Sequence, residues 1–290
     1  MPTKTFRTAD PFRGSLAVAR GEVTWERLRR HEFTKLRPDT YVGAATPDDL
    51  WLRVRGLSVW AGPEAVVAGP VAALAWEVEC PWDSDEVVLR TSRHPGPGGA
   101  RVRRDDLAPD EVTRRWGTPI TTSVRTAFDL ARRTPLPDAV AAVDALAHAW
   151  RFGPDDLAAL AAAHPGVRGL VQVRRVIALL DGRAESLPES RLRVGLVLRG
   201  VPPPVPQYPV RLPSGRGARL DLAWPRPRPG LRPVALEYDG PEHRTIRGHG
   251  LDLDREAGLD DLGWDVVRVT ARQMRDLDAL AARVLRKLGQ

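Results

Sequence analysis

The sequence predicts an α/β protein, α+β overall, that is divided into more than one domain. The chain has 290 residues, which exceeds the ~100–150 residues of a typical domain. Its composition, 42% hydrophobic and 28% charged, is that of a globular protein rather than a disordered chain. The period of the apolar residues also changes along the chain, from mixed to helical and back to mixed. We therefore expect an N-terminal region at 1–120, a helical connector at 121–183 and a C-terminal domain at 184–290.

The N-terminal residues have the pattern of a helix-turn-helix followed by a wing. A first helix ends near Gly21, a second runs from Thr24 to about His31 with Thr24 as its N-cap, and an extended hairpin follows at 33–42. A recognition helix faces phosphates or base edges, so we assign the arginines of the second helix to DNA contacts. They are Arg27, Arg29 and Arg30. The alternative is an arginine-rich helix that only faces solvent.

The next region, 48–119, alternates apolar stretches with turns and predicts a small α+β unit. Prolines and glycines at 94–99 indicate a loop within it. From Thr122 to Leu180 the apolar period becomes helical, which predicts the connector. Prolines mark the breaks of the connector, each close to where a helix should start or stop. They are Pro135, Pro154 and Pro165.

The C-terminal domain has the pattern of the element order αββαβα. A helix at 187–199 is followed by a proline-rich turn at 202–206, where the helix cannot continue. The remaining elements are expected as strands at 219–223 and 234–238, a helix at 252–262, a strand at 265–269 and an amphipathic helix that ends at Leu288.

The charge and the cysteine content bear on partners and location. The net charge of +7 and the sequence pI of about 10.3 favour a polyanionic partner, because neutralising phosphates releases counterions. The single cysteine, Cys80, excludes an intramolecular disulfide and a cysteine-rich zinc site and favours a reducing compartment. The first residues lack the apolar core of a signal peptide, and no apolar run approaches the ~18 residues of a membrane span. We expect a cytoplasmic protein without a membrane partner.

Acidic residues on two neighbouring strands carry the strongest chemical signal. One strand contains Asp221, and the next ends in Glu237, Tyr238 and Asp239. Side chains two apart on a strand share a face, so Glu237 and Asp239 point the same way and Tyr238 points the other way. If the strands pair, Asp221 joins them, and three converging carboxylates stay ionised only when a cation compensates them. The pattern predicts Mg²⁺ or Mn²⁺ held by Asp221, Glu237 and Asp239, in a site for phosphodiester hydrolysis.

Two further residues are candidates near this site. His243 follows the second strand closely enough to reach the same pocket as a general acid or base, and the alternative is a histidine exposed in a polar loop. Glu189 ends the sequence Ser-Leu-Pro-Glu from Ser186, which spells a helix capping box with proline in the first turn. The pattern by itself therefore gives Glu189 a capping role.

Ordered motifs run through the last third of the chain. They are Glu-Ser-Leu-Pro-Glu-Ser-Arg-Leu-Arg from Glu185, Arg-Leu-Asp-Leu-Ala-Trp from Arg219, Glu-Tyr-Asp-Gly-Pro-Glu-His from Glu237, Asp254-Arg255, Leu259, Gly-Trp-Asp-Val-Val-Arg-Val-Thr from Gly263, and Gln273. In these motifs the chain resembles the nuclease-like domain related to very-short-patch repair endonucleases. That domain belongs to the PD-(D/E)xK superfamily, whose fold is restriction-endonuclease-like.

The resemblance implies a role for each matching residue. Asp221 and Glu237 would be metal ligands, Glu189 would contribute from the preceding helix to the metal shell or to the position of the attacking water, and His243 would be the acid/base. The chain departs from the superfamily pattern at Asp239, where a lysine is usual, and this leaves the base open. Arg255 and its neighbour Asp254 would support the site or pair with one another.

The front of the chain resembles the abortive-infection type IV antitoxin family, whose members begin with a winged helix. The residues that carry this resemblance are Thr24-Trp25-Glu26-Arg27-Leu28, Tyr41-Val42, the stretch from Ala65 to Leu74, and Ile120-Thr-Thr-Ser-Val-Arg-Thr-Ala-Phe-Asp-Leu-Ala131. Antitoxin domains of this kind and the nuclease-like domain occur fused. The resemblance therefore implies a head that targets DNA on a domain that cuts it.

We expect a Mg²⁺-dependent endodeoxyribonuclease that acts on double-stranded DNA. A second hypothesis is a non-catalytic DNA-binding antitoxin or transcriptional repressor with a degenerate nuclease fold, for which operator DNA or a toxin would be the partner. A third is a structural charge cluster in which Asp221 pairs with an arginine such as Arg219 or Arg244; a surface pair of this kind stabilises a fold little.

Overall fold

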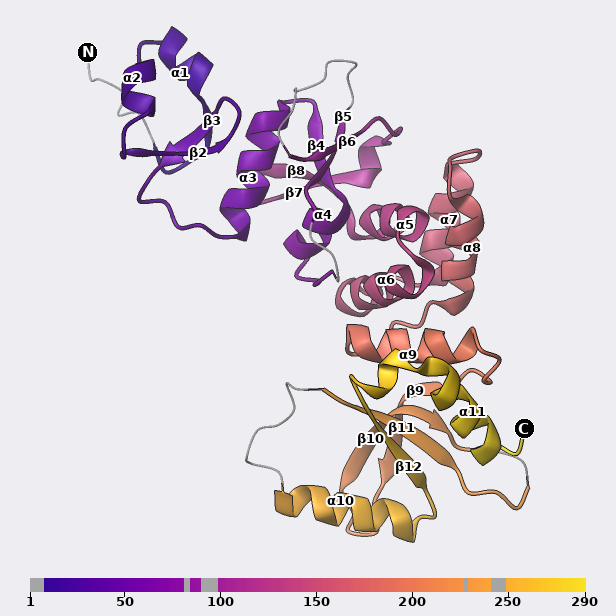
Figure 1. The fold of residues 1–290 in the computed structure, drawn as a ribbon. Helices are drawn as coiled ribbons and strands as arrows, with labels where there is room; N and C mark the ends of the chain where they lie inside the picture. The colour runs from indigo at the N-terminus through magenta and orange to yellow at the C-terminus, as the bar shows by residue number, and fades with distance from the viewer. Residues whose placement is uncertain (1–7, 81–83, 90–98, 227–228, 241–248) are drawn as a thin grey trace. The chain divides into compact units, whose positions relative to one another are not determined.

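The computed structural model describes residues 8–80, 84–89, 99–226, 229–240 and 249–290, and its architecture is α+β (Figure 1). The chain forms two compact units. Unit 1 contains Met1–Arg132 and Ala159–Pro165, and unit 2 contains Arg133–Ala158 and Gly166–Gln290. The expected connector at 121–183 is thus divided between the two units. None of the helices in the described ranges combines the length and hydropathy that crossing a bilayer requires.

Unit 1 begins with two short helices and a three-stranded antiparallel sheet. The helices are α1 (Gly14–Ala19) and α2 (Trp25–Leu28), and the strand order is β1 (Phe12–Arg13), β3 (Thr40–Gly43), β2 (Phe33–Arg37). Thr24 caps α2 as expected, because its hydroxyl accepts a hydrogen bond from the Arg27 amide (3.2 Å). Gly21, at φ +71°, follows the end of α1. Ala17, Val23, Leu28, Phe33 and Tyr41 form the small core.

The second helix is shorter than the sequence pattern indicates, and this corrects the placement of the arginines. Of the three assigned to DNA contacts, only Arg27 lies within α2; Arg29 is its C-cap and Arg30 lies beyond it. The amides of Arg30 and Phe33 bond to the carbonyls of Arg27 and Arg30, so the chain turns at once into β2. Burial of Phe33 in the core fixes that turn.

A five-stranded mixed sheet forms the rest of unit 1, as the expected small α+β unit. Two helices cover this sheet. The first, α3, starts after its N-cap Asp49, whose side chain accepts a hydrogen bond from the Leu52 amide (2.8 Å). This helix extends well beyond the apolar stretch at its start. The loop expected at 94–99 lies largely outside the described residues. The elements are α3 (Leu50–Ala61) and α4 (Gly69–Ala75), a 3-10 turn at Pro109–Glu111, and strands in the order β6 (Arg101–Arg103), β5 (Glu86–Leu89), β4 (Ala65–Ala68), β8 (Thr118–Thr121), β7 (Val112–Arg115).

Four helices follow, as the apolar period predicts: α5 (Ser123–Arg133), α6 (Leu136–Trp150), α7 (Pro154–Ala163) and α8 (Leu170–Leu179). The prolines stand at their limits, with Pro135 as the N-cap of α6, Pro154 as the first residue of α7 and Pro165 just past the end of α7. A proline lacks the amide hydrogen that a helix interior needs, and these positions do not need one.

The C-terminal part of unit 2 is a four-stranded sheet with helices on both faces (Figure 1). β11 and β12 are parallel and the other neighbours antiparallel. The elements are α9 (Leu187–Val197), β9 (Val205–Arg211), β10 (Gly217–Trp224), β11 (Val234–Asp239), α10 (His249–Asp261), β12 (Asp265–Thr270), a 3-10 turn at Gln273–Arg275 and α11 (Leu277–Lys287), and the strand order is β12-β11-β10-β9.

Strand β9 is an addition to the expected order αββαβα. The strand overlaps the turn expected at 202–206 and contains Pro206 and Pro209, although proline cannot donate to a strand ladder. Among the described strands, β9 lies at the edge of the sheet and pairs with β10 alone. An edge strand tolerates prolines because a missing donor on its open side interrupts no ladder.

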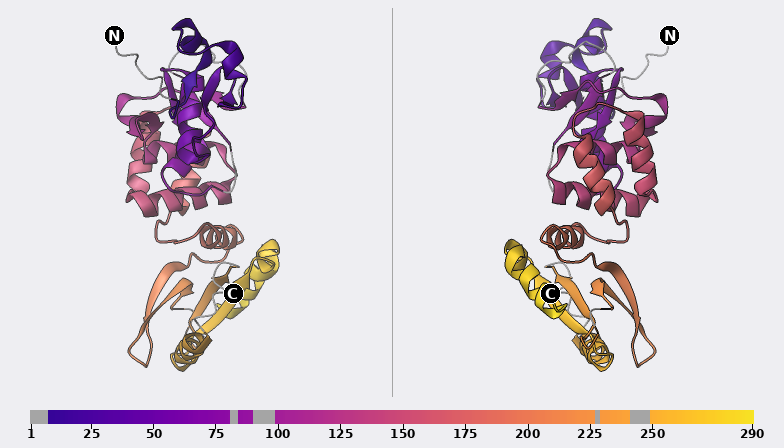
Figure 2. Two further views of the ribbon diagram at one scale, coloured as in Figure 1. Left: turned by 90° about the vertical axis from the view of Figure 1, so that its left-hand side faces the viewer. Right: turned by 90° about the vertical axis from the view of Figure 1, so that its right-hand side faces the viewer.

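Each face of this sheet has its own core. On one face, α9 and α11 pack against each other and on the sheet, as the two side views also show (Figure 2). On the other face, α10 contributes Leu259 to a second core with Leu220, Ala235 and Trp264. Because Glu237 is two residues after Ala235, it lies on the face that α10 covers.

A buried charged residue of α6 fixes the position of α9. Asp144 accepts hydrogen bonds from the Ser190 hydroxyl (2.6 Å), the Arg193 guanidinium (2.7 Å) and the Asp181 amide (2.8 Å). Its side chain is fully buried and burial raises the pKa of its carboxyl to about 6. Since Ser190 follows Glu189 directly, these contacts also set where Glu189 lies.

Candidate active site

The first turn of α9 holds Glu189, and the capping box expected there is present. The Ser186 hydroxyl accepts from the Glu189 amide (3.3 Å) and donates to the Glu189 carboxylate (2.7 Å), which also accepts from the Glu185 amide (3.3 Å). A contact that the sequence analysis missed is the Gln207 side-chain amide of β9, which donates to Glu189 Oε2 (2.8 Å). Glu189 is 8% exposed. The Glu189 carboxylate is therefore held by three hydrogen bonds.

Asp221 and Glu237 come from paired strands. The antiparallel register ends with the pair Leu222–Leu236, and Asp221 and Glu237 are the residues next to this last pair on their strands. Asp221 Oδ2 accepts a hydrogen bond from the Tyr238 amide (2.8 Å), which ties its side chain to β11. Asp239 lies two residues after Glu237 on the same strand.

The carboxylates of this region influence one another. The pKa of Asp221 is raised to about 6, mainly by burial and further by repulsion from Glu189 and Glu237. The Tyr238 amide and the Arg255 guanidinium oppose this rise without cancelling it. Carboxylates from α9, β10 and β11 thus share one electrostatic environment in which negative charge is in excess.

Arg255 of α10 supplies a cation to this region. Its guanidinium binds both oxygens of Glu237, with Nη1 to Oε2 at 2.9 Å, and Nη2 also donates to the Arg219 carbonyl (2.9 Å). From the sequence, Arg255 was expected to support the site or to pair with Asp254. The available signal was its spacing from Leu259, which places both on the face of α10 that packs on the sheet.

A pocket of about 390 Å³ adjoins this ion pair, between α10 and the strands β11 and β12. The parallel register puts Arg268 of β12 beside Glu237. Arg268 pairs with Glu256 of α10, and Arg232 donates to Asp260 (2.6 Å). The walls of the pocket therefore carry paired acidic and basic side chains, with Glu237 and Arg255 among them.

The candidate residues do not all meet. As the side chains lie, no group of three His, Cys, Asp or Glu residues within the described ranges is placed to hold a metal ion. His243 lies outside the described residues, as does Arg244. Arg219 pairs with Glu185 rather than with Asp221. The hypothesis that Asp221 pairs with Arg219 is therefore wrong.

The donor set has the chemistry of a hard-cation site. Asp221, Glu237 and Glu189 supply carboxylate oxygens, which Mg²⁺ and Mn²⁺ prefer. Oδ1 of Asp221 has no hydrogen-bond partner among the described residues, while Oδ2 is held by Tyr238. The Arg255 guanidinium on Glu237 already balances part of the negative charge.

The arginines assigned to DNA contacts are exposed at the surface of unit 1. Arg27 pairs with Glu32, and Arg30 pairs with Glu26 (2.6 Å). Arg29 is exposed, and its guanidinium has no ion pair among the described residues. Exposed pairs of this kind exchange readily for phosphates, since each contributes little to stability.

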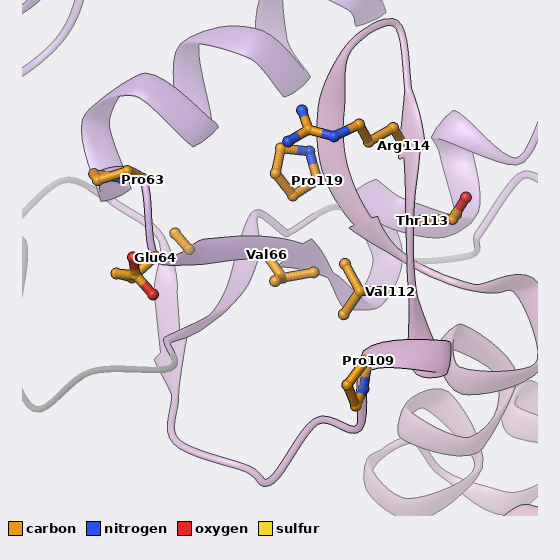
Figure 3. A pocket seen from close by; sticks show the side chains of 9 residues that line it. Pro63, Glu64, Val66, Pro109, Val112, Thr113, Arg114 and Pro119 are labelled. Carbon is orange, nitrogen blue, oxygen red and sulfur yellow. The ribbon is translucent and has the colours of Figure 1, made fainter.

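A second pocket, in unit 1, has fewer charged side chains than the pocket beside Glu237. It measures about 580 Å³ and lies between β4 and β7, lined by prolines and by aliphatic residues such as Val66 and Val112 (Figure 3). Its charged side chains are Glu64 and Arg114, and Arg114 donates to the Gly117 carbonyl (2.7 Å). Nothing in this lining selects a reaction.

Unit 1 also contains a buried charge network that the sequence analysis recorded only as part of a motif. Arg125, 1% exposed, donates to Asp129 (3.2 Å), to the Asp106 carbonyl (2.8 Å) and to Glu111. His164 also contacts Glu111. The guanidinium is buried and engaged with carboxylates and a carbonyl of the protein itself, which indicates a structural role.

Comparison with known proteins gives relatives but no described activity. No protein-family model matches the chain. Two uncharacterized proteins of Mycobacterium tuberculosis, MT2308 and Rv2248, are each 30% identical to it over 258 residues, which span 86% of this chain and 90% of the relative. The similarity extends over both units. The chain therefore belongs to the protein family that includes these two mycobacterial proteins.

Proposed function

We propose that this protein is a metal-dependent DNA endonuclease, with an N-terminal head that binds double-stranded DNA. The observation that carries the proposal is that Asp221 and Glu237 each follow the last pair of the β10–β11 register, and that the charges of Glu189 and Glu237 both act on Asp221. Buried carboxylates that repel one another cost stability, and a site that binds a cation is a physical reason to keep them. Unit 2 would then be the restriction-endonuclease-like domain.

Each residue has a role in this proposal. Asp221, Glu237 and Asp239 would hold Mg²⁺ or Mn²⁺, and Glu189 would orient the attacking water. The bound ion supplies a polarised phosphate and a water of lowered pKa. His243 is proposed as the acid or base. Tyr238 holds Asp221 through its amide, so that one carboxylate oxygen stays directed at the site.

The proposed head is the helix pair and hairpin at the start of unit 1. Arg27, Arg29 and Arg30 would bind phosphates, consistent with their exposure and with the net charge of +7. A single cysteine, Cys80, favours the cytoplasm as the setting.

Plasmid cleavage tests the proposal. The wild-type protein incubated with supercoiled plasmid and Mg²⁺ or Mn²⁺ should nick or linearise it, and EDTA should prevent this. Asp221→Ala and Glu237→Ala should abolish cleavage. Asp278→Ala, which removes an exposed carboxylate paired with Arg199, is the matched control and should keep full activity. Full activity in either site variant would rule out the assignment.

The second candidate is a non-catalytic DNA-binding antitoxin or transcriptional repressor with a degenerate nuclease fold. The ion pair between Arg255 and Glu237 favours it, because a guanidinium on a candidate ligand leaves less need for a metal ion. Under this reading the full-length protein would shift its operator DNA in EDTA and take up no Mn²⁺ in a calorimetric titration. A toxin encoded beside it would be a further partner.

A further inference from the structure

We propose that Arg255 exchanges partners during DNA binding, leaving Glu237 for a phosphate of the bound strand when a divalent ion takes the carboxylate. This inference rests on the proposed endonuclease function and adds a residue to it. It makes Arg255 the side chain that couples metal binding to DNA binding. The guanidinium of Arg255 has two contacts, one with Glu237 and one with the Arg219 carbonyl.

The first step is competition at Glu237. Both carboxylate oxygens accept from Arg255, and this side chain of Glu237 is only 13% exposed. A metal ion bound through the same oxygens would meet a like charge at ion-pair distance. Since two cations so close repel strongly in a partly buried site, the guanidinium must withdraw for the ion to bind fully.

The second step concerns where Arg255 goes. Its helix is fixed by Leu259, which is buried in the core beneath α10, so the side chain moves and the backbone stays. The side chain is 28% exposed and lines the 390 Å³ pocket that also contains Glu237. The bond from Nη2 to the Arg219 carbonyl offers a pivot at the rim. A short rotation therefore presents the guanidinium to whatever enters the pocket.

The third step is the nature of the ligand. A planar guanidinium binds two oxygens of a phosphate in the same manner in which it binds Glu237. The charged side chains of the pocket nearly cancel, with Arg232, Arg255 and Arg268 against Glu237, Glu256, Asp260 and Asp265. A divalent ion would turn this balance positive. The pocket would then attract the DNA backbone only after the ion has bound.

Two titrations on folded protein test the exchange. Mn²⁺ affinity is measured by calorimetry without DNA, and duplex affinity by fluorescence anisotropy with Ca²⁺ to prevent cleavage. Arg255→Ala should bind Mn²⁺ about tenfold more tightly than wild type, because its competitor is gone. The same variant should bind duplex about tenfold more weakly in Ca²⁺, since a charge-assisted contact with phosphate is lost.

Controls separate this exchange from other roles. Arg232→Ala removes the same charge from the same pocket, but its guanidinium bonds to Asp260 and to the Gly263 carbonyl (2.8 Å), so its Mn²⁺ affinity should stay near that of wild type. Arg255→Gln keeps a donor for the Arg219 carbonyl and replaces Arg255→Ala if the latter unfolds. It should shift both affinities in the same directions.

The outcomes are distinct. Tighter Mn²⁺ binding together with weaker duplex binding supports the exchange, because a residue that only supports the fold would weaken both. Unchanged or weaker Mn²⁺ binding in Arg255→Ala and Arg255→Gln, with wild type binding the ion and nicking plasmid, overturns the exchange and leaves the nuclease. A wild type that neither binds Mn²⁺ nor cuts DNA overturns both.

Discussion

The charge networks around Arg125 in unit 1 and around Asp221 in unit 2 are built from the same residue types with opposite results. In unit 1, the guanidinium groups of Arg125 and Arg132 pair with the carboxylates of Glu111, Asp129 and Asp105. Each of these carboxylates contacts a guanidinium, and the arginines stack on a ring between them. The network is closed, because the protein supplies both signs of charge.

In unit 2, by contrast, Asp221 makes no ion pair within the described residues. Asp221 has an amide as its direct partner and two carboxylates as neighbours, and Arg255 is engaged by Glu237. The pKa of Asp221 is raised mainly by burial, and repulsion from Glu189 and Glu237 adds to the rise. A closed network stabilises a fold, while an unbalanced one costs stability and is retained where something else must bind.

The largest expected effect is in the closed network. Arg125→Ala should lower the free energy of unfolding by about 3–5 kcal/mol, because it strands buried carboxylates without their cation. Urea unfolding of the full chain, followed by circular dichroism, measures the loss. Arg30→Ala, which removes an exposed ion pair, is the control and should change stability by less than about 0.5 kcal/mol. Equal losses in both variants would contradict the contrast.

A smaller effect of the opposite sign is expected at Asp221. Asp221→Asn keeps an acceptor for the Tyr238 amide and removes a repelled charge, so stability at pH 7.5 should rise by about 1–3 kcal/mol while Mn²⁺ binding is lost. Thermal unfolding without metal measures the gain. A clear loss of stability would mean that the charge of Asp221 is needed by the fold, as it is in the Arg125 network.

The stabilities of wild type and Asp221→Asn should also differ in their pH dependence. The folded pKa of Asp221, about 6, lies above its ordinary value of 3.8, so the folded state binds the proton more tightly. The stability that this proton contributes is complete below about 3.8 and lost as the pH rises through about 6. Wild-type stability relative to Asp221→Asn should therefore fall between pH 4.5 and pH 7.5. A stability difference between the two proteins that stays constant over this pH range would contradict a raised pKa of Asp221.

The smallest effect on stability, and a clear one on DNA, is expected in the head. Arg29→Ala should leave unfolding unchanged and reduce the salt dependence of duplex binding, by about 0.9 in the log–log slope if one phosphate contact is lost. Filter binding across a range of NaCl concentrations measures the slope. Arg199→Ala, an exposed arginine of unit 2 that pairs with Asp278, should keep the wild-type slope. An unchanged salt-dependence slope in Arg29→Ala would mean that Arg29 does not contact DNA phosphates.

Local sequence signals accounted for much of the fold. Thr24 and Ser186 cap the helices that follow them, and the prolines of the connector stand at helix limits, because caps and prolines act through their own backbone neighbours. Strand β9 was not predicted, because a strand can contain Pro206 and Pro209 only if it lies at the edge of a sheet. That is a property of the assembled sheet.

For the candidate site, too, local patterns were predictable from the sequence and contacts made by packing were not. The alternation of Glu237, Tyr238 and Asp239, with Asp221 on the preceding strand, predicted which carboxylates share a face, and the two strands pair as far as Leu222 and Leu236, next to Asp221 and Glu237. The contact of Arg255 with Glu237 was not predictable, because it joins residues of α10 and β11 that only packing brings together. Whether these carboxylates bind a metal ion stays a prediction.

A calorimetric titration of Mn²⁺ into metal-free protein at pH 7.5 tests the central claim most directly. The account predicts that wild type binds the ion, that Asp221→Ala and Glu237→Ala lose this binding, and that Asp278→Ala retains it. Identical isotherms for all four proteins, or no heat of binding in wild type, would contradict the claim that these carboxylates are kept for a divalent cation.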